Sequence, residues 1–210
     1  MKKRLIVLLR HAQTMLSSGK RLIGQCDVEL SKEGIENSKE LGEALKLYGF
    51  KHVFSSALMR SKQTAGLVSG LTGTAITIEP GLNEISLGAW DGLFVEDIKK
   101  EYPAEYVQRG QNMISYRPPG GENFEDLQKR VLETFSKLLG YDGQLLIVAH
   151  ASVNKVILAN AMKLPLYNIS EIKQDYLCCN VISQTGEDLE LKLINGNAMD
   201  LTNILLEKNI

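Results

Sequence analysis

Two short apolar runs in this chain end in residues that suit phosphate chemistry. Arg10 and His11 follow the run 5–9, and His150 follows the run 145–149. Such runs are typical of buried strands, and ligands of open α/β sheets bind at the carboxyl ends of strands. A neutral imidazole there can act as a nucleophile, and a guanidinium beside it can bind two phosphate oxygens. The pair of strand-end histidines therefore indicates a ligand site rather than two structural histidines.

The elements that must position these residues alternate between strands and helices. Ser31 and Asn123 are N-cap candidates, because their side-chain oxygens can accept hydrogen bonds from first-turn amides. His52, the third histidine, begins a strand and is expected at the surface. Strands separated by helices favour a mainly parallel sheet covered on both faces. The patterning predicts strands at 4–9, 52–55, 75–78 and 144–149, helices at 31–48, 58–71, 94–101, 123–139 and 152–163, and a hairpin of 177–183 with 189–194.

Composition excludes several classes of protein. The 210 residues are 44% hydrophobic and 23% charged, which is ordinary for a globular protein with its own core. A net charge of −1 predicts no general attraction to nucleic acid or to an anionic membrane. No apolar run reaches transmembrane length. Cys26, Cys178 and Cys179 fit no disulfide framework, so a reducing, cytoplasmic setting is expected.

The chain resembles the histidine phosphatase superfamily, the phosphoglycerate mutase-like proteins, through most of its length. The opening motif of that family, Arg-His-Gly followed by an acidic or amide residue and Thr or Ser, reads Arg-His-Ala-Gln-Thr at 10–14. The resemblance implies an α/β fold, a three-layer α/β/α sandwich, as one domain over 1–210 with a cap-like insertion at about 80–120. The other matching segments are 21–30, 55–64, 83–92, 118–122 and 148–151.

The resemblance also implies a role for each charged residue of these motifs. His11 takes the position of the nucleophile and would form a phosphohistidine, which divides one difficult hydrolysis into two easier steps. Arg10, Arg60 and His150 take positions around the phosphoryl oxygens, where they would hold the negative charge. Glu84 takes the position of the proton donor to the leaving alcohol.

Further phosphate-binding candidates follow from the same motifs, including positions where the chain departs from the family. Ala12 and Ala151 replace glycine, and the backbone amide of Ala151 still offers a donor. Ser17 stands where the family has asparagine and can also hydrogen-bond a phosphate. Arg21 and Gly24, in the loop before the first helix, are expected on the substrate side of the pocket.

These motifs together predict a metal-independent phosphomonoesterase that needs no cofactor and acts on a small phosphorylated metabolite. Segments 23–30 and 119–122 resemble the α-ribazole phosphatase branch, which acts on a precursor in cobalamin biosynthesis, although broad-specificity phosphatases share much of both. Cofactor-dependent phosphoglycerate mutase is the alternative enzyme. A catalytically inactive family member that serves as a binding module is the alternative of another class, but all five charged site residues are present. A homodimer is left open.

The sequence lacks the motifs of several other enzymes that transfer phosphoryl or acyl groups. The chain has no Gly-x-x-x-x-Gly-Lys-Ser/Thr loop for a nucleotide and no cysteine followed six positions later by arginine. Three scattered histidines and no Asp-x-Asp cluster argue against a dinuclear metal site. A Gly-x-Ser-x-Gly elbow of esterases is also missing.

Overall fold

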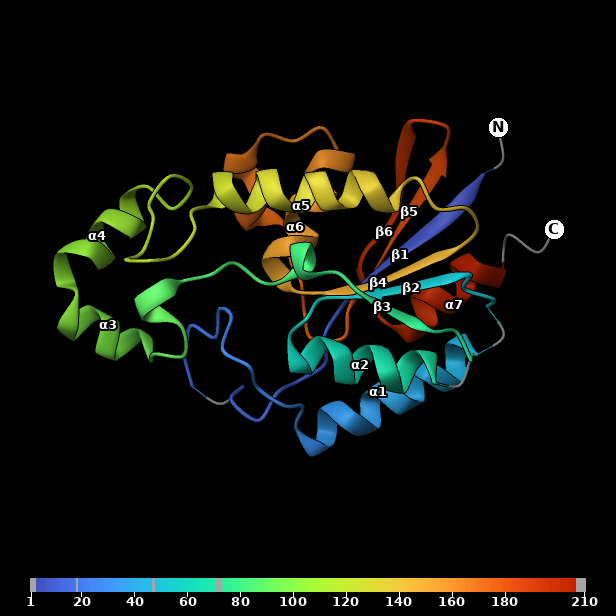
Figure 1. Ribbon diagram of the computed structural model, residues 1–210, viewed down its shortest axis with the longest axis horizontal. Coiled ribbons are helices and arrows are strands. Elements are labelled where there is room, and N and C mark those ends of the chain that lie inside the picture. The colour runs from blue at the N-terminus through green and yellow to red at the C-terminus, as the bar shows by residue number, and fades with distance from the viewer. Residues whose placement is uncertain (1–2, 18, 47, 71–72, 207–210) are drawn as a thin grey trace.

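A twisted sheet forms the centre of the computed structural model, which describes residues 3–17, 19–46, 48–70 and 73–206 (Figure 1). Within those residues the sheet has six strands in the order β3-β2-β4-β1-β5-β6. The pairs β3·β2, β2·β4 and β4·β1 are parallel, whereas β5 and β6 form the antiparallel hairpin expected from the sequence. The strands are β1 (Arg4–Arg10), β2 (His52–Ser55), β3 (Ile76–Ile78), β4 (Leu145–Ala149), β5 (Cys179–Thr185) and β6 (Asp188–Gly196).

Helices cover both faces of this sheet, which confirms the three-layer α/β/α fold. Alternate side chains of β1 point toward the two helical layers. Ile6 and Leu8 pack on one face of the sheet, and Leu5, Val7 and Leu9 pack on the other. All five side chains are buried, as expected for a parallel strand between two helical layers. The first face is covered by α5 (Phe124–Leu138) and α6 (Ala151–Ala161), and the second by α1 (Lys32–Leu45), α2 (Met59–Ser69) and α7 (Ala198–Leu206).

Local sequence signals account for where the long helices begin. The Ser31 hydroxyl accepts a hydrogen bond from the Gly34 amide, and Asn123 forms a reciprocal capping box with Asp126. The predicted first helix is too long, since α1 ends at Leu45. Helix α7 was not predicted at all.

Between β3 and α5 the chain leaves the sheet and forms a cap at one end of the molecule (Figure 1). The cap contains the short helix α3 (Val95–Glu101) that the sequence predicts and a second helix, α4 (Pro103–Gln111), that it does not. None of the α4 residues is fully buried, and Tyr106 packs against the core as a partly buried side chain. Trp90 anchors the cap, because it is fully buried and packs on Tyr102 and Tyr116.

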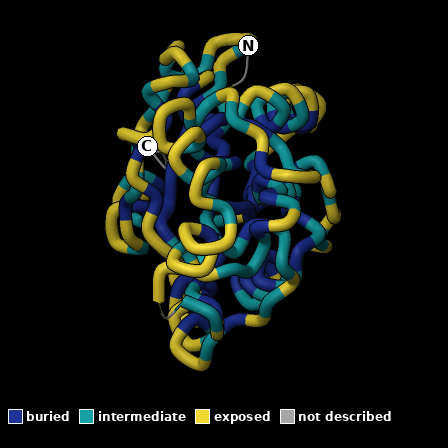
Figure 2. The backbone as a smooth tube through the Cα atoms, turned by 90° about the vertical axis from the view of Figure 1, so that its left-hand side faces the viewer, coloured by how far each residue is buried: buried dark blue, intermediate teal, exposed yellow. Residues whose placement is uncertain are grey.

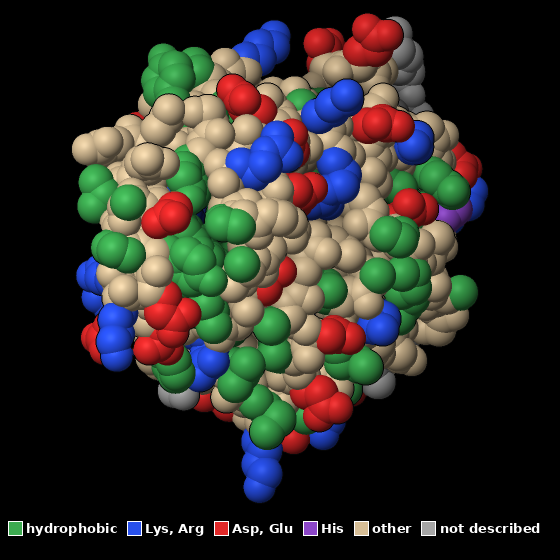
Figure 3. Space-filling view, turned by 60° about the vertical axis from the view of Figure 1, so that its left-hand side comes forward, with side chains coloured by type: hydrophobic (Ala, Val, Ile, Leu, Met, Phe, Trp, Pro, Cys, Tyr) green, Lys and Arg blue, Asp and Glu red, His purple; other side chains and the backbone are tan. Residues whose placement is uncertain are grey.

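The surface of the cap end is polar and mixed in charge. Figure 2 shows exposed chain across this end, with buried residues gathered behind it. Figure 3 shows basic and acidic side chains interspersed on the face that includes the cap. Among the residues that the structure describes, no helix is long and apolar enough to cross a membrane.

The register of the central strands brings the two histidine motifs together. Strands β1 and β4 are parallel neighbours, and Arg10 lies opposite Ala149 at their carboxyl ends. His11 and His150 therefore leave the sheet side by side, at the edge where open α/β sheets bind ligands.

Candidate active site

A cavity of about 230 Å³ lies at the carboxyl edge of the sheet, beneath the cap. Its wall combines charged and polar side chains from segments far apart in the sequence with an apolar side that includes Leu22, Ile85 and Phe124. The charged and polar wall residues are Arg10, His11, Thr14, Arg21, Arg60, Glu84, Arg109, Ser152 and Tyr176.

His11 has one ring nitrogen fixed and the other available. Its Nδ1 lies 2.8 Å from the Ala12 carbonyl oxygen, which can only accept, so Nδ1 carries the proton. Its Nε2 then has a lone pair, which accepts a hydrogen bond of 3.2 Å from Arg60 Nε. Burial, together with the charges of Arg60 and Arg10, holds the pKa of His11 well below 6.5. The imidazole is therefore neutral, as a nucleophile must be.

Arg60 reaches this position from the first turn of α2. Its guanidinium is buried and donates to the Gly24 and Cys26 carbonyl oxygens, both at 2.7 Å. Burial lowers the pKa of Arg60, whereas the Glu84 and Asp27 carboxylates raise it. These two carbonyl bonds hold the guanidinium beside His11.

Arg10 is held from the opposite side by the segment before β5. Its Nη1 donates to the Gln174 carbonyl oxygen at 2.6 Å, and its guanidinium lies 4.0 Å from the centre of the Tyr176 ring. The Tyr176 ring is also 5.7 Å from the ring of His11. A cation over an aromatic face is attracted by the ring, so Tyr176 helps to hold Arg10 at the cavity.

His150 is fully buried directly beside His11. The centres of the His150 and His11 rings are 5.1 Å apart. Burial lowers the pKa of His150 well below 6.5, and the positive charges of Arg60 and Arg10 lower it further. Its Nε2 lies 2.7 Å from the hydroxyl of Ser56, a buried residue between β2 and α2.

The two buried neutral histidines are expected to make folding sensitive to acid. In the unfolded chain they bind protons near pH 6.5, but in the folded chain only well below it, so the unfolded state gains protons first. The free energy of unfolding should fall below pH 6.5 by up to about 1.4 kcal/mol per pH unit for each histidine. Urea unfolding between pH 7 and 5 measures this slope. The variants His11→Gln and His150→Gln should each have a shallower slope, and an unchanged slope in both would contradict the assignment.

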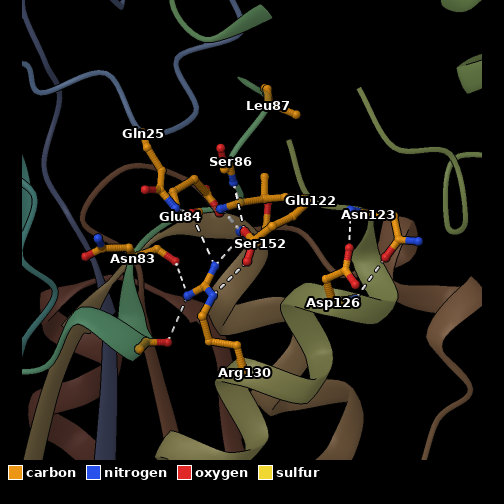
Figure 4. A network of polar contacts seen from close by, with 12 residues as sticks. Gln25, Asn83, Glu84, Ser86, Leu87, Glu122, Asn123, Asp126, Arg130 and Ser152 are labelled. Atoms are coloured by element: carbon orange, nitrogen blue, oxygen red, sulfur yellow. Dashed lines mark hydrogen bonds and ion pairs between the residues drawn. The ribbon is translucent and has the colours of Figure 1, made fainter. Parts of the chain in front are cut away.

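Glu84 lines the same cavity from the loop that leads into the cap. Its Oε1 accepts a hydrogen bond from the Ile85 amide at 2.9 Å, and its Oε2 accepts one from the Ser152 amide at 3.3 Å. Ser152 lies in the first turn of α6, where free backbone amides favour a negative group. These bonds orient the carboxyl group at the cavity wall (Figure 4).

The backbone around Glu84 is fixed by Arg130 on α5 (Figure 4). The Arg130 guanidinium donates to the carbonyl oxygens of Gly81 and Asn83, both at 3.0 Å, and pairs with the Glu122 carboxylate at 2.8 Å. Glu122 in turn accepts a hydrogen bond from the Ser86 amide. One cation thus ties the chain entering the cap to the chain leaving it.

Two glycines allow the chain that enters the cap, near residue 88, to pack closely against the chain that leaves it, near residue 121. Gly88 has φ of +56°, and a Cβ there would collide with the backbone of 119–121. A Cβ on Gly121 would collide with the Ser86 carbonyl oxygen and the Leu87 backbone. This close approach explains Gly88 and Gly121 by packing rather than by ligand contact.

Four other predicted site residues have different outcomes. Arg21 lines the cavity, where it donates to the Gly92 carbonyl oxygen and stacks on Phe94. Gly24 also lines it, and its carbonyl oxygen is a partner of Arg60. Over the described residues the cavity wall includes neither Ser17 nor Ala151, and the fully buried His150 is not among its lining residues. The Ser17 hydroxyl instead donates to the Thr14 carbonyl oxygen, and Ser152 rather than Ala151 faces the cavity.

Sequence reasoning also missed several wall residues. Thr14 belongs to the opening motif but has no predicted role. Its hydroxyl is buried at the cavity without a hydrogen-bond partner among the described residues. Arg109 comes from the unpredicted helix α4, and burial lowers its pKa. Tyr176 carried no signal in the sequence, because its importance depends on contacts between distant segments. Ser56 belongs to the matching segment 55–64, but its contact with His150 was not predicted.

The described part of the chain contains no group of three His, Cys, Asp or Glu side chains placed to hold a metal ion.

Comparisons with known proteins agree with this geometry. Residues 6–197 match the model of the histidine phosphatase superfamily (branch 1). A Salmonella newport protein named "Probable phosphoglycerate mutase GpmB" is 26% identical over 164 residues, 77% of this chain and 76% of the relative. The alpha-ribazole phosphatase from Shigella flexneri is 26% identical, with a TM-score of 0.87 over 91% of this chain and 96% of its own. A mycobacterial glucosyl-3-phosphoglycerate phosphatase is 27% identical, with a TM-score of 0.82 over 93% and 100%. Because the family match spans nearly the whole fold, this chain belongs to the histidine phosphatase superfamily and is a phosphatase enzyme.

Proposed function

We propose that this enzyme is a phosphomonoesterase that hydrolyses a small phosphorylated metabolite through a phosphohistidine on His11. The observation that carries the proposal is the state of His11 at the cavity. Its Nδ1–H is held by a carbonyl oxygen, and its Nε2 lone pair lies against the Arg60 guanidinium. A neutral nucleophile beside two cations suits attack on a dianionic phosphate monoester.

The reaction has two displacements at phosphorus. Nε2 of His11 forms a bond to phosphorus while the bond to the alcohol oxygen breaks, and Glu84 gives its proton to that oxygen. Arg10 and Arg60 hold the negative charge of the phosphoryl oxygens during the transfer. Water then attacks the phosphohistidine and gives a proton to Glu84, which releases inorganic phosphate and restores both side chains.

As the substrate we favour α-ribazole 5'-phosphate, from which the alcohol α-ribazole would be released. A broad-specificity phosphatase that accepts several phosphate monoesters is the other candidate. The support is the resemblance of segments 23–30 and 119–122 to that branch and the likeness to the Shigella flexneri enzyme. The apolar wall formed by Leu22, Ile85 and Phe124 suits an alcohol with a nonpolar surface.

Arg109 favours a second candidate, an alcohol that carries an acid group. Its side chain lines the cavity, and no acidic side chain among the described residues forms an ion pair with it. A phosphoglycerate would supply the missing anion. Phosphoglycerate mutase therefore stays the alternative activity, in line with the name of the Salmonella relative.

An assay that separates hydrolysis from mutase activity tests the proposal. With α-ribazole 5'-phosphate the enzyme should release inorganic phosphate. With 3-phosphoglycerate and 2,3-bisphosphoglycerate it should form little 2-phosphoglycerate, because water rather than a second phosphoglycerate would accept the phosphoryl group. The products are followed by phosphorus NMR, and the His11→Ala variant measures the background. Rapid interconversion of the two monophosphates would establish the mutase instead.

A further inference from the structure

The hydroxyl of Ser56 is the one side-chain group bonded to His150 in the described part of the structure. Both residues are fully buried, so neither can exchange this partner for solvent. The Ser56 oxygen also accepts a weak hydrogen bond from the Leu58 amide, at 3.4 Å. The other ring nitrogen of His150, Nδ1, has no hydrogen-bond partner among the described residues.

Two neutral tautomers of His150 are compatible with a 2.7 Å contact to a hydroxyl, and they differ in what they leave unpaired. If Nε2 carries the proton, it donates to Ser56, and the Ser56 proton then has no acceptor among the described residues. Nδ1 is also left as an unpaired buried acceptor. If Nδ1 carries the proton, Ser56 donates to Nε2, and only the Nδ1–H lacks a partner.

The second arrangement leaves fewer unpaired groups, and each buried unpaired polar group destabilises a fold measurably. It also leaves the Nδ1–H of His150 free to act as a hydrogen-bond donor. An N–H beside His11 can donate to a phosphoryl oxygen, whereas a lone pair at that place would repel one.

We propose that Ser56 is a positioning residue that fixes His150 in the tautomer with the proton on Nδ1, and so makes His150 a hydrogen-bond donor to the phosphoryl group. The role of His150 toward phosphate rests on the proposed function. The tautomer itself is a property of the resting protein. In the resting protein, burial and the neighbouring arginines keep His150 neutral, so the position of its one ring proton decides whether Nδ1 is a donor.

Nitrogen NMR of the histidine rings tests the tautomer directly, without a substrate. The chain has only three histidines, so its ¹⁵N-labelled spectrum at pH 7 is simple, and His150→Gln and His52→Asn assign the signals. The wild type should show Nδ1 of His150 as the protonated nitrogen and Nε2 as the bare one. Protonation of Nε2 in the wild type would overturn the proposal, whatever the variants do.

Matched variants test whether Ser56 is responsible. Ser56→Ala should give a mixture of His150 tautomers, and Ser56→Thr should restore the single one. Ser61→Ala is the control, because it removes a nearby buried hydroxyl in the first turn of α2, one that bonds to Ser55 and Val148 instead. If Ser56→Ala keeps the single tautomer, Ser56 does not fix it and the proposal fails.

Binding of inorganic phosphate provides the functional readout. Loss of one hydrogen bond to a charged group corresponds to about 10- to 100-fold in affinity, and Ser56→Ala should lose up to that amount while Ser61→Ala keeps wild-type affinity. Equal loss in both variants would contradict a specific role of Ser56. Absence of phosphatase activity in a wild type with the expected tautomer would refute the proposed function but not the tautomer.

Discussion

Replacement of His11 by alanine is expected to lower the rate of phosphate release by several orders of magnitude. The variant keeps both arginines but loses the atom that forms the bond to phosphorus, and removal of a covalent nucleophile is among the most damaging changes in an enzyme. With labelled substrate and a rapid quench, the wild type should carry phosphate that is released by acid and retained in base, as expected for a phosphohistidine. The variant should carry none.

The control for this variant is His52→Ala. His52 begins β2 and makes a 3.6 Å contact with Asp142, at the edge of the sheet opposite the cavity. The His52→Ala variant should carry labelled phosphate and hydrolyse the substrate like the wild type. Substantial turnover by His11→Ala, or label that persists in it, would mean that another group is the nucleophile.

The second large effect is expected for Glu84→Gln. Glutamine keeps the shape of the side chain, and its one carbonyl oxygen can still accept the hydrogen bond from Ile85 or the one from Ser152, but it has no proton to give to the leaving alcohol. An alkyl phosphate needs that proton because its leaving alkoxide is a strong base. Its hydrolysis should slow by about 10²–10⁴-fold, the usual range for a positioned proton donor.

An aryl ester provides the internal comparison for Glu84. p-Nitrophenolate leaves as a stable anion, so the phosphorylation step with p-nitrophenyl phosphate should slow much less. Burst kinetics separate that step from dephosphorylation, in which Glu84 accepts the proton of water. Equal loss of the phosphorylation rate for both esters would show that Glu84 is structural, and Glu79, Asp91 and Glu122 would be the next candidates.

The sequence predicts most of the sheet and its covering layers because their signals are local. Apolar runs mark β1 and β4, and Ser31 and Asn123 cap the helices that they were expected to cap. Helix α4 was not predicted, and none of its residues is fully buried, so it offers no run of core residues like those of β1 and β4. The strand order makes β1 and β4 neighbours, and the register of this parallel pair then brings His11 beside His150.

The sequence predicts the site residues that belong to short motifs but not those that act through contacts between distant segments. Residues that belong to short motifs, such as Arg10, His11 and Arg60, could be named from the sequence. Residues that act through long-range contacts could not. Tyr176 meets Arg10 across 166 positions of the chain, and its cation–π contact leaves no trace in local sequence. The site roles of all these residues stay predictions until the variants above are measured.

The attachment of the cap through Arg130 has a consequence for how such enzymes diversify. Arg130 bonds to the backbone of Gly81 and Asn83, just before Glu84, and to Glu122 at the far end of the cap. The chain on both sides of the cap, including the backbone next to the predicted proton donor Glu84, is therefore anchored to α5. We therefore expect substitutions at exposed positions of α4, which contributes Arg109 to the cavity, to alter which alcohol fits without displacing Glu84. Selection for a new substrate can thus proceed in one part of the chain while the hydrolytic chemistry is inherited unchanged in another.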